Sequence, residues 1–228
     1  MSTIAANIST LSERINAAAQ LAQRDPATIG LLAVSKTKPA QALREAYAAG
    51  LRDFGENYLQ EALSKQLELA DLPLCWHFIG PIQSNKTRAI AENFAWVHSV
   101  DRLKIAQRLS EQRPAELPPL NICIQVNVSG EASKSGCAPA DLPALAEAIS
   151  ALPRLELRGL MAIPEPTDDI AEQNAAFAAV STLQAQLNLP LDTLSMGMSH
   201  DLEAAIAQGA TWVRIGTALF GASDYGQA

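Results

Sequence analysis

Lys36 is the residue of this sequence with the clearest chemical potential, because it comes directly after an apolar segment at 29–34 and one serine. Such a segment predicts a buried strand. Side chains alternate across a strand, so Leu32, Val34 and Lys36 share one face, and the lysine is the polar end of an apolar column. Partial desolvation and the like charge of Lys38 both favour a neutral amine, the nucleophile that forms a Schiff base with an aldehyde. The alternative interpretation is a lysine that extends from a strand end into water.

The composition indicates a globular protein with a substantial core. The chain has 228 residues, of which 48% are hydrophobic and 18% charged. This length suits a single α/β barrel. The net charge of −7 is spread along the chain without a basic stretch, which argues against nucleic acid or an anionic membrane as a partner. Any anion that the protein binds must therefore be bound locally.

The cysteines and the N-terminal segment indicate a reducing, cytoplasmic setting. Cys75, Cys123 and Cys137 form no C-x-x-C pair, so neither a disulfide framework nor a metal site is predicted. The start of the sequence lacks the basic and apolar regions of a signal peptide. No segment has about 18 consecutive apolar residues, as a membrane-spanning helix would need. A soluble, cytoplasmic protein is expected.

Helical and strand patterns alternate along the whole chain. Helices are expected at 2–23, 41–49, 56–70, 83–92, 102–112, 140–151, 170–187 and 201–208, and strands at 29–34, 51–55, 74–79, 94–100, 120–128, 155–163, 193–196 and 211–215. Eight short apolar strands separated by helices predict a parallel sheet, and eight is the number that closes a barrel. We therefore predict one domain over 1–228, a (β/α)8 TIM barrel with an extra N-terminal helix. An open doubly wound sheet is the alternative, because periodicity does not reveal closure.

The loops after the last two predicted strands could hold a phosphate. Ser199 is a natural N-cap for the helix at 201–208, with its hydroxyl group and the following backbone N–H groups facing outward. Gly216 lets a ligand approach the backbone, and Thr217 can begin a final short turn. These loops are the usual phosphate site of a TIM barrel. The charge of Asp201 would oppose a phosphate nearby.

Two other segments resemble functional motifs. The segment at 80–87 is close to a P-loop, but Asn85 replaces its second glycine and Pro81 removes a backbone N–H group, so nucleotide hydrolysis is disfavoured. Lys134, in the loop at 129–136, is interpreted as a solvated charge, with a second docking point for the aldehyde as the alternative hypothesis.

Five separated motifs resemble the pyridoxal phosphate homeostasis protein family, which is itself similar to the barrel domain of alanine racemase. They are A-V-S-K-T-K-P at 33–39, F-G-E-N-Y at 54–58, W-H-F-I-G-P-I-Q-S-N-K at 76–86, L-S-M-G-M-S-H-D at 194–201 and V-R-I-G-T-A-L-F-G at 213–221. Their order and spacing run across nearly the whole chain.

The resemblance implies a binding site for pyridoxal 5′-phosphate (PLP). It implies that Lys36 carries PLP as a Schiff base and that Arg214 faces the pyridine nitrogen. The remaining residues implied to bind the cofactor are the phosphate ligands Ser199, Gly216 and Thr217, and the pocket residues Asn57 and His77.

An arginine at the ring nitrogen favours a carrier of the cofactor over an enzyme. A permanent cation leaves that nitrogen unprotonated, so the ring withdraws electrons weakly. The resemblance also implies that a racemase needs a base from a further domain, and this chain ends at Ala228; Tyr225 is a poor substitute on a short tail. No catalytic residue is therefore predicted. We expect a monomer that buffers PLP and delivers it to apo PLP-dependent enzymes, with amino acids as transimination ligands. The alternative is an amino-acid racemase or lyase.

Overall fold

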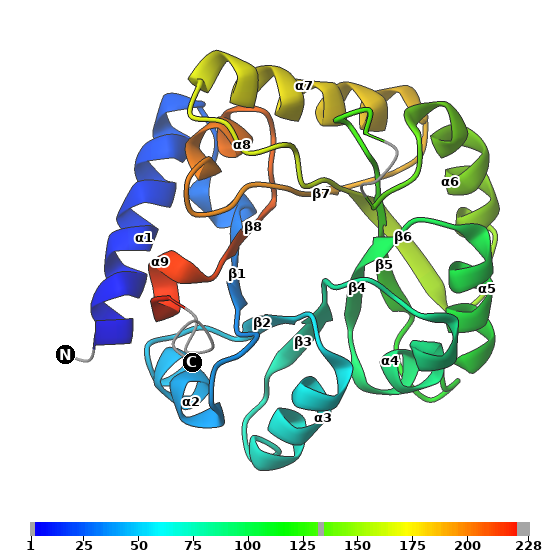
Figure 1. Cartoon of the computed structure of the whole chain (residues 1–228), viewed down its shortest axis with the longest axis horizontal. Helices are drawn as coiled ribbons and strands as arrows, with labels where there is room; N and C mark the ends of the chain where they lie inside the picture. The colour runs from blue at the N-terminus through cyan, green and yellow to red at the C-terminus, as the bar shows by residue number, and fades with distance from the viewer. Residues whose placement is uncertain (1–2, 132–134, 223–228) are drawn as a thin grey trace.

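The chain folds as a closed barrel of eight parallel strands surrounded by helices (Figure 1). The computed structural model describes residues 3–131 and 135–222. Each strand pairs with its neighbour in sequence, and β1 pairs in parallel with β8, which closes the sheet. The predicted (β/α)8 barrel with an extra N-terminal helix is thus confirmed, and the open sheet is excluded.

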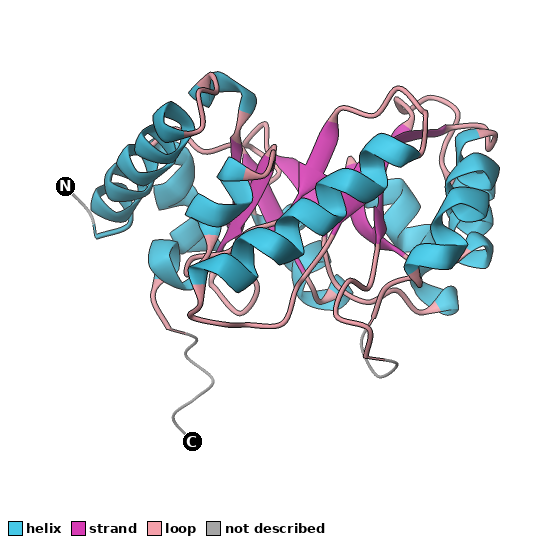
Figure 2. Ribbon diagram, turned by 90° about the horizontal axis from the view of Figure 1, so that it is seen from above, coloured by secondary structure: helices cyan, strands magenta, loops and turns pink. Residues whose placement is uncertain are grey.

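The strands lie at the centre of the molecule and the helices outside them (Figure 2). The strands are β1 (Gly30–Val34), β2 (Asp53–Glu56), β3 (Cys75–Phe78), β4 (Trp96–Val100), β5 (Leu120–Gln125), β6 (Leu155–Met161), β7 (Thr193–Ser195) and β8 (Trp212–Ile215). The helices are α1 (Thr3–Leu21), α2 (Ala40–Ala48), α3 (Leu59–Glu68), α4 (Thr87–Asn93), α5 (Leu103–Gln112), α6 (Leu142–Ser150), α7 (Ile170–Gln186), α8 (Leu202–Ala207) and α9 (Thr217–Phe220). Short 3₁₀ turns are η1 (Pro26–Thr28), η2 (Ser84–Lys86) and η3 (Pro139–Asp141). None of the helices described is both long and apolar enough to cross a bilayer.

The predicted elements differ from the observed ones mainly at their ends. The helices expected at 83–92 and 140–151 each begin with a 3₁₀ turn. The strand expected at 120–128 ends at Gln125, because Val126 forms an isolated bridge with Cys137. Local pairing with a later segment therefore replaces the last part of that strand.

Aromatic rings fill the barrel interior at the end where the strands begin. Trp96 stacks on the imidazole of His77 at a centroid distance of 5.5 Å, and Trp212 meets the same imidazole edge-on at 5.0 Å. Gly30 leaves the space for this packing, since a Cβ there would collide with the indole ring of Trp212. The interior is therefore solid at this end.

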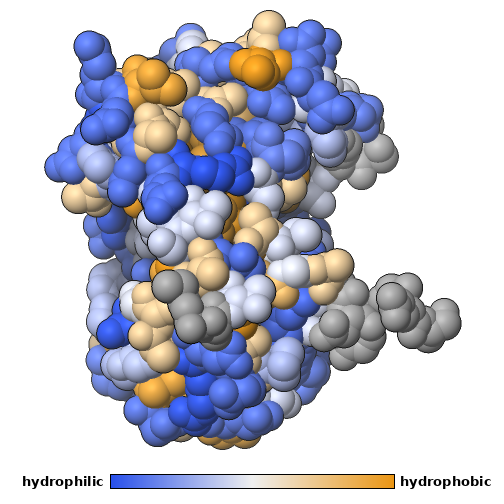
Figure 3. Space-filling view, turned by 90° about the vertical axis from the view of Figure 1, so that its left-hand side faces the viewer, coloured by the Kyte–Doolittle hydropathy of each residue, from blue (hydrophilic) through white to orange (hydrophobic). Residues whose placement is uncertain are grey.

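Helix α1 braces the loops at the other end of the barrel. Its apolar side chains Ile8, Leu11 and Ile15 are buried, while the face of the molecule that includes this helix is mostly hydrophilic (Figure 3). Asn7 donates a hydrogen bond to the carbonyl of Leu219, at 2.8 Å. Arg14 donates to the Ser199 carbonyl at 2.9 Å, and forms a salt bridge with Glu203 at 2.8 Å. The extra helix thus ties down the segments after β7 and β8.

A Gly159→Ala substitution is expected to separate β6 from β7. The new Cβ would collide with the backbone carbonyl of Thr193, which is paired with Gly159. We expect a loss of about 2 kcal/mol or more in the free energy of unfolding, measured by urea denaturation. The matched control is Gly50→Ala, where the backbone φ is 108° but no atom lies within 4 Å of the new Cβ. Its loss should be the smaller, about 1 kcal/mol. Equal losses would show that the strands adapt to the added methyl group.

Candidate functional site

A cavity of about 250 Å³ opens at the end of the barrel where the strands finish. It is lined by Val34, Lys36, Ile79, Ile163, Met198, Ser199, His200, Arg214, Gly216 and Thr217. Five of these residues are ones that the sequence singled out for cofactor binding: Lys36, Ser199, Arg214, Gly216 and Thr217. They come from three separate segments of the chain, and barrel closure brings them together.

Lys36 lies on a turn after β1, where its side chain is exposed. Strand β1 ends at Val34, and Thr37 adopts a left-handed φ of 65°, which turns the chain over the barrel mouth. The predicted partial desolvation of Lys36 is therefore wrong. Lys38 is the buried lysine, 9% exposed, and its ammonium group donates a hydrogen bond to the Ala222 carbonyl at 2.6 Å. The structure provides an amine that a ligand can reach.

A buried charged cluster supports the backbone next to Lys36. The Nζ atom of Lys65 donates to the Ser35 carbonyl at 2.6 Å and to Oε1 of Glu56 at 2.7 Å, and also pairs with Glu61 at 2.8 Å. The Ser35 hydroxyl donates to the same Glu56 oxygen at 2.9 Å. Burial raises the pKa of Glu56, although the charge of Lys65 opposes that shift. The other Glu56 oxygen is buried and has no hydrogen-bond partner among the described residues.

Glu61 extends this support to the turn itself. Its carboxylate accepts the Thr37 backbone N–H at 2.5 Å, so the residues on both sides of Lys36 are held by α3 and β2. Sequence reasoning missed the cluster. The available signal was the Glu61 and Lys65 pair at helical i,i+4 spacing, but that pattern usually indicates a solvated pair.

Two loops at the cavity rim form the candidate phosphate cradle. The prediction that Ser199 caps the following helix is wrong: α8 begins at Leu202, and the Ser199 hydroxyl accepts the Ala218 backbone N–H at 3.4 Å. The reason is that Asp201 accepts the Met198 N–H at 2.7 Å, which folds the loop back before the helix starts. The hydroxyl thus links the loop after β7 to α9.

Gly216 and Thr217 complete the other side of the cradle. A Cβ on Gly216 would lie 3.4 Å from the Cβ of Val34, a distance of ordinary contact, so packing alone does not require glycine there. Val34 also lines the cavity, so the absent side chain leaves its mouth open. The Ala218 N–H of α9 donates to Ser199 and the next two N–H groups donate to the Gly216 carbonyl, so the Thr217 N–H is the one at the start of the helix that the described residues leave for a ligand. This N–H group and the neighbouring hydroxyl groups suit an anionic ligand.

Arg214 is a cation buried at the floor of the cavity. It is 4% exposed, and it donates to the Ser195 hydroxyl at 2.8 Å and to the Ala162 carbonyl at 3.0 Å. Burial lowers the pKa of its guanidinium to about 10. Within residues 3–131 and 135–222 no carboxylate forms a salt bridge with it. An acceptor on a bound ring would therefore meet a fixed donor with spare positive charge.

Asn57 and His77 are not among the residues that line this cavity. The Asn57 side-chain oxygen is buried, and no residue in the described ranges hydrogen bonds to it. His77 is fully buried inside the barrel, where it contacts Asp53 at 2.8 Å and His98 at 2.9 Å. Lys134 and Tyr225, which the sequence raised as alternatives, lie outside the described residues.

The two histidines are held neutral by their surroundings. Burial lowers the pKa of His77, although the charge of Asp53 opposes that shift. Burial lowers the pKa of His98 well below its usual value, and the neighbouring His77 and Arg214 lower it further. Both imidazoles therefore have one N–H donor and one acceptor nitrogen.

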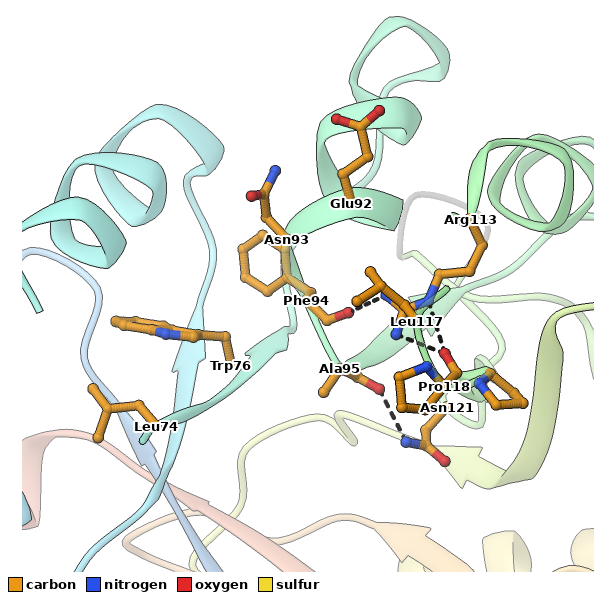
Figure 4. A pocket seen from close by; sticks show the side chains of 11 residues that line it. Leu74, Trp76, Glu92, Asn93, Phe94, Ala95, Arg113, Leu117, Pro118 and Asn121 are labelled. Carbon is orange, nitrogen blue, oxygen red and sulfur yellow. Dashed lines mark hydrogen bonds between the residues drawn. The ribbon is translucent and has the colours of Figure 1, made fainter. Parts of the chain in front are cut away.

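Other hollows on the molecule offer less chemistry. A cavity of about 410 Å³ lies where β3, β4 and β5 begin (Figure 4). Its cation Arg113 already donates to the carbonyls of Ala91, Phe94 and Pro118. This cavity is larger than the one at Lys36, but its charge is fully used by the protein.

One group of side chains has donor atoms close enough for a metal ion, which the sequence analysis did not predict. The ligand atoms of Asp53, Cys75 and His77 all lie within 4.8 Å of one another, where β2 and β3 begin. Burial and the Asp53 charge raise the pKa of the Cys75 thiol to about 12, and Asp53 already hydrogen bonds to His77. The sequence could not show this group because its members come from two strands.

The barrel, with a lysine after its first strand and a polar cradle after its last two, defines a class of single-barrel protein related to alanine racemase. The family model described as the alanine racemase N-terminal domain matches residues 3–224. The chain belongs to this family and, within it, to the pyridoxal phosphate homeostasis proteins.

Individual relatives agree with this placement. The pyridoxal phosphate homeostasis protein of Pseudomonas aeruginosa is 80% identical over 226 residues, covering 99% of this chain and 98% of that protein. The structure of PipY from Synechococcus elongatus, solved with PLP bound, has a TM-score of 0.85 and 44% identity, and covers 96% of this chain and 100% of that one. Alanine racemase from Corynebacterium glutamicum shares the fold, with a TM-score of 0.69 at 19% identity over 96% of this chain and 61% of that one.

Replacing Lys65 with methionine should leave the carboxylate of Glu56 buried without its main counter-charge. We expect Lys65→Met to lower the free energy of unfolding by about 3–5 kcal/mol at neutral pH, measured by urea denaturation. The double variant Lys65→Met/Glu56→Gln removes both charges and should recover part of that loss. A double variant as unstable as the single one would contradict a dominant role for the buried charge pair.

The buried histidines should make the protein less stable as the pH falls. Both have folded pKa values below the usual 6.5, so only the unfolded chain takes up their protons as the pH drops through that value. Each then costs up to about 1.4 kcal/mol per pH unit below roughly pH 6.5. Glu56 has a raised pKa and acts in the opposite direction, so the comparison is made with a His98→Asn variant.

The measurement is urea denaturation of both proteins between about pH 7 and pH 5. Over this interval the free energy of unfolding of the original protein should fall more than that of His98→Asn. The difference should be up to about 1.4 kcal/mol per pH unit below roughly pH 6.5, the contribution of one histidine. Parallel curves would mean that His98 is not held neutral.

Proposed function

We propose that this protein binds PLP through a Schiff-base link to Lys36 and buffers or delivers the cofactor within the cell, without substantial catalytic turnover. The observation that carries the proposal is that the Lys36 amine, the Arg214 guanidinium and the cradle residues Ser199, Gly216 and Thr217 all line one small cavity. The site therefore has a nucleophile, a donor for the ring and groups for the phosphate in one space.

The cavity fits such a ligand in size and in unsatisfied groups. Its volume of about 250 Å³ is just below the range of roughly 300–1,000 Å³ typical of pockets for drug-sized ligands, as suits one small ring with a phosphate. Arg214 has no salt-bridge partner in the part of the chain that the structure describes. PipY, a relative of similar length, was solved with PLP bound.

The roles of the residues follow from their positions. The nitrogen of Lys36 replaces the aldehyde oxygen of PLP, which leaves as water, and the exposed turn gives the aldehyde access. Ser199 and Thr217 hydrogen bond to the phosphate, and Gly216 lets it approach the backbone. Asn57 remains a proposed pocket residue, with its unpartnered oxygen as the available acceptor. We assign His77 to the support of Arg214, not to direct contact.

Two observations favour a carrier over an enzyme. PLP supplies an electron-withdrawing ring when it is bound, and the Arg214 cation at the floor of the cavity opposes protonation of the ring nitrogen, which weakens that property. The curated relatives are named as homeostasis proteins. Release would follow when an amine, such as an amino acid, reaches the exposed link at Lys36 and takes its place. Apo PLP-dependent enzymes are the proposed recipients.

A Lys36→Ala variant tests the assignment. After incubation with PLP and reduction with borohydride, the original protein should gain the mass of one cofactor on Lys36, found by peptide mapping. Lys36→Ala should fold normally, because the residue is exposed, yet bind at least about tenfold less PLP. Lys104→Ala is the matched control, since it removes an exposed lysine on α5 and should bind normally.

Undiminished labelling of Lys36→Ala would refute the role of this lysine. The enzyme alternative is tested on the same samples with enantiopure amino acids: sustained loss of optical purity or consumption of the amino acid would refute the carrier proposal.

A further inference from the structure

A continuous chain of side-chain hydrogen bonds crosses the barrel interior behind the cavity. Arg214 Nη1 lies 2.8 Å from Ser195 Oγ, which lies 2.7 Å from His98 Nδ1. His98 Nε2 lies 2.9 Å from His77 Nδ1, and His77 Nε2 lies 2.8 Å from Asp53 Oδ1. This hydrogen-bond chain begins at Arg214 of β8, beside the ligand cavity, and ends at Asp53, the first residue of β2, near the opposite end of the barrel.

The chemistry of the two ends gives this chain a single direction. Arg214 can only donate, and an ionised Asp53 can only accept. The His77 nitrogen facing Asp53 therefore has the proton, so its other nitrogen accepts from His98. The remaining nitrogen of His98 then accepts the Ser195 hydroxyl proton, which leaves a lone pair of that oxygen directed at Arg214. One donor and one acceptor meet at every contact.

Because this hydrogen-bond chain ends at an arginine, the hydrogen bonds fix the orientation of side chains and do not transfer protons. A guanidinium does not release its proton under ordinary conditions. Among the described residues, no carboxylate forms a salt bridge with Arg214. The hydrogen-bonded dipoles of Ser195, His98 and His77 connect its buried charge to the carboxylate of Asp53. The rings of Trp96 and Trp212 pack against His77. Hydrogen bonds in such a low-dielectric interior reinforce one another.

We propose that His98 is a positioning residue for the cofactor site: through Ser195 it holds Arg214 in place for the ring, with His77 and Asp53 fixing the tautomer of His98. This inference rests on the proposed function, because its purpose is the orientation of Arg214 toward PLP. It also gives His77 a role that does not depend on contact with the cofactor.

Two substitutions at His98 separate its two hydrogen bonds. The amide of asparagine occupies about the position of Nδ1, so His98→Asn can still accept from Ser195. The amide of glutamine reaches about the position of Nε2, so His98→Gln keeps the contact with His77 and loses the one with Ser195. Both variants replace the imidazole ring with a smaller amide side chain and differ in which hydrogen bond they keep, so each serves as the control for the other.

The measurements are the rate of PLP release from loaded protein and the visible absorption spectrum of the bound cofactor at one fixed pH. We expect His98→Gln to release PLP about tenfold faster and to change the spectrum, as loss of one buried hydrogen bond would cause. His98→Asn should stay within about threefold of the original protein with an unchanged spectrum. Equal behaviour of the two loaded variants would overturn the proposal.

A ligand-free measurement makes the inference independent of cofactor binding and of the stability of the variants. Nitrogen NMR of the original protein should show neutral His98 with its proton on Nε2 and Nδ1 unprotonated. The opposite tautomer, or a doubly protonated ring near neutral pH, would overturn the chain's direction. If the protein takes up no PLP while this tautomer is found, the proposed function fails and the hydrogen-bond chain stands.

Discussion

The pairing of β1 with β8 is the constraint on which the site depends. This pairing sets Leu32 opposite Arg214 and Ala33 opposite Ile215. The turn with Lys36 therefore emerges beside the segment with Gly216, although the two are far apart in sequence. Parallel strands also place all their carboxyl ends on one rim, so the loop after β7 reaches the same space. Without closure of the sheet, the amine and the cradle would lie at opposite edges.

Buried charge supports the two sides of this rim in different ways. The buried pair of Lys65 and Glu56 supports the backbone before Lys36, because Lys65 donates a hydrogen bond to the Ser35 carbonyl. The Lys36 side chain itself remains exposed. Arg214 is held by neutral acceptors, and its buried charge is left for a ligand. An exposed amine above a fixed donor suits the proposed ligand, which must be both held and released, because a fixed ring orientation would not prevent another amine from reaching the proposed link to Lys36.

The sequence predicted the fold and half of the residues that line the cavity, because both depend largely on local patterns. Strand and helix periodicity predicted eight strand–helix units, the ends of the strands pointed to Lys36 and Gly216, and the family resemblance pointed to Arg214. Burial was predicted less well, since Lys36 is exposed and Lys38 is the buried lysine once a left-handed residue turns the chain. The chain from Asp53 to Arg214 could not be predicted, because its five members come from five strands and meet only across the barrel interior.

The same hydrogen-bond chain bears on why this barrel would carry a cofactor and not use it. An enzyme that needs a strongly electron-withdrawing ring benefits from an acid at the ring nitrogen. In the proposed site the buried donor is an arginine, and the lowered pKa values of His98 and His77 mean that the groups behind it supply no acidic proton. Conversion to an acidic partner would require changing Arg214 and the direction of every hydrogen bond behind it, because the present chain runs from donor to acceptor toward Asp53. Under the proposed function, the barrel interior therefore favours a weakly activated ring.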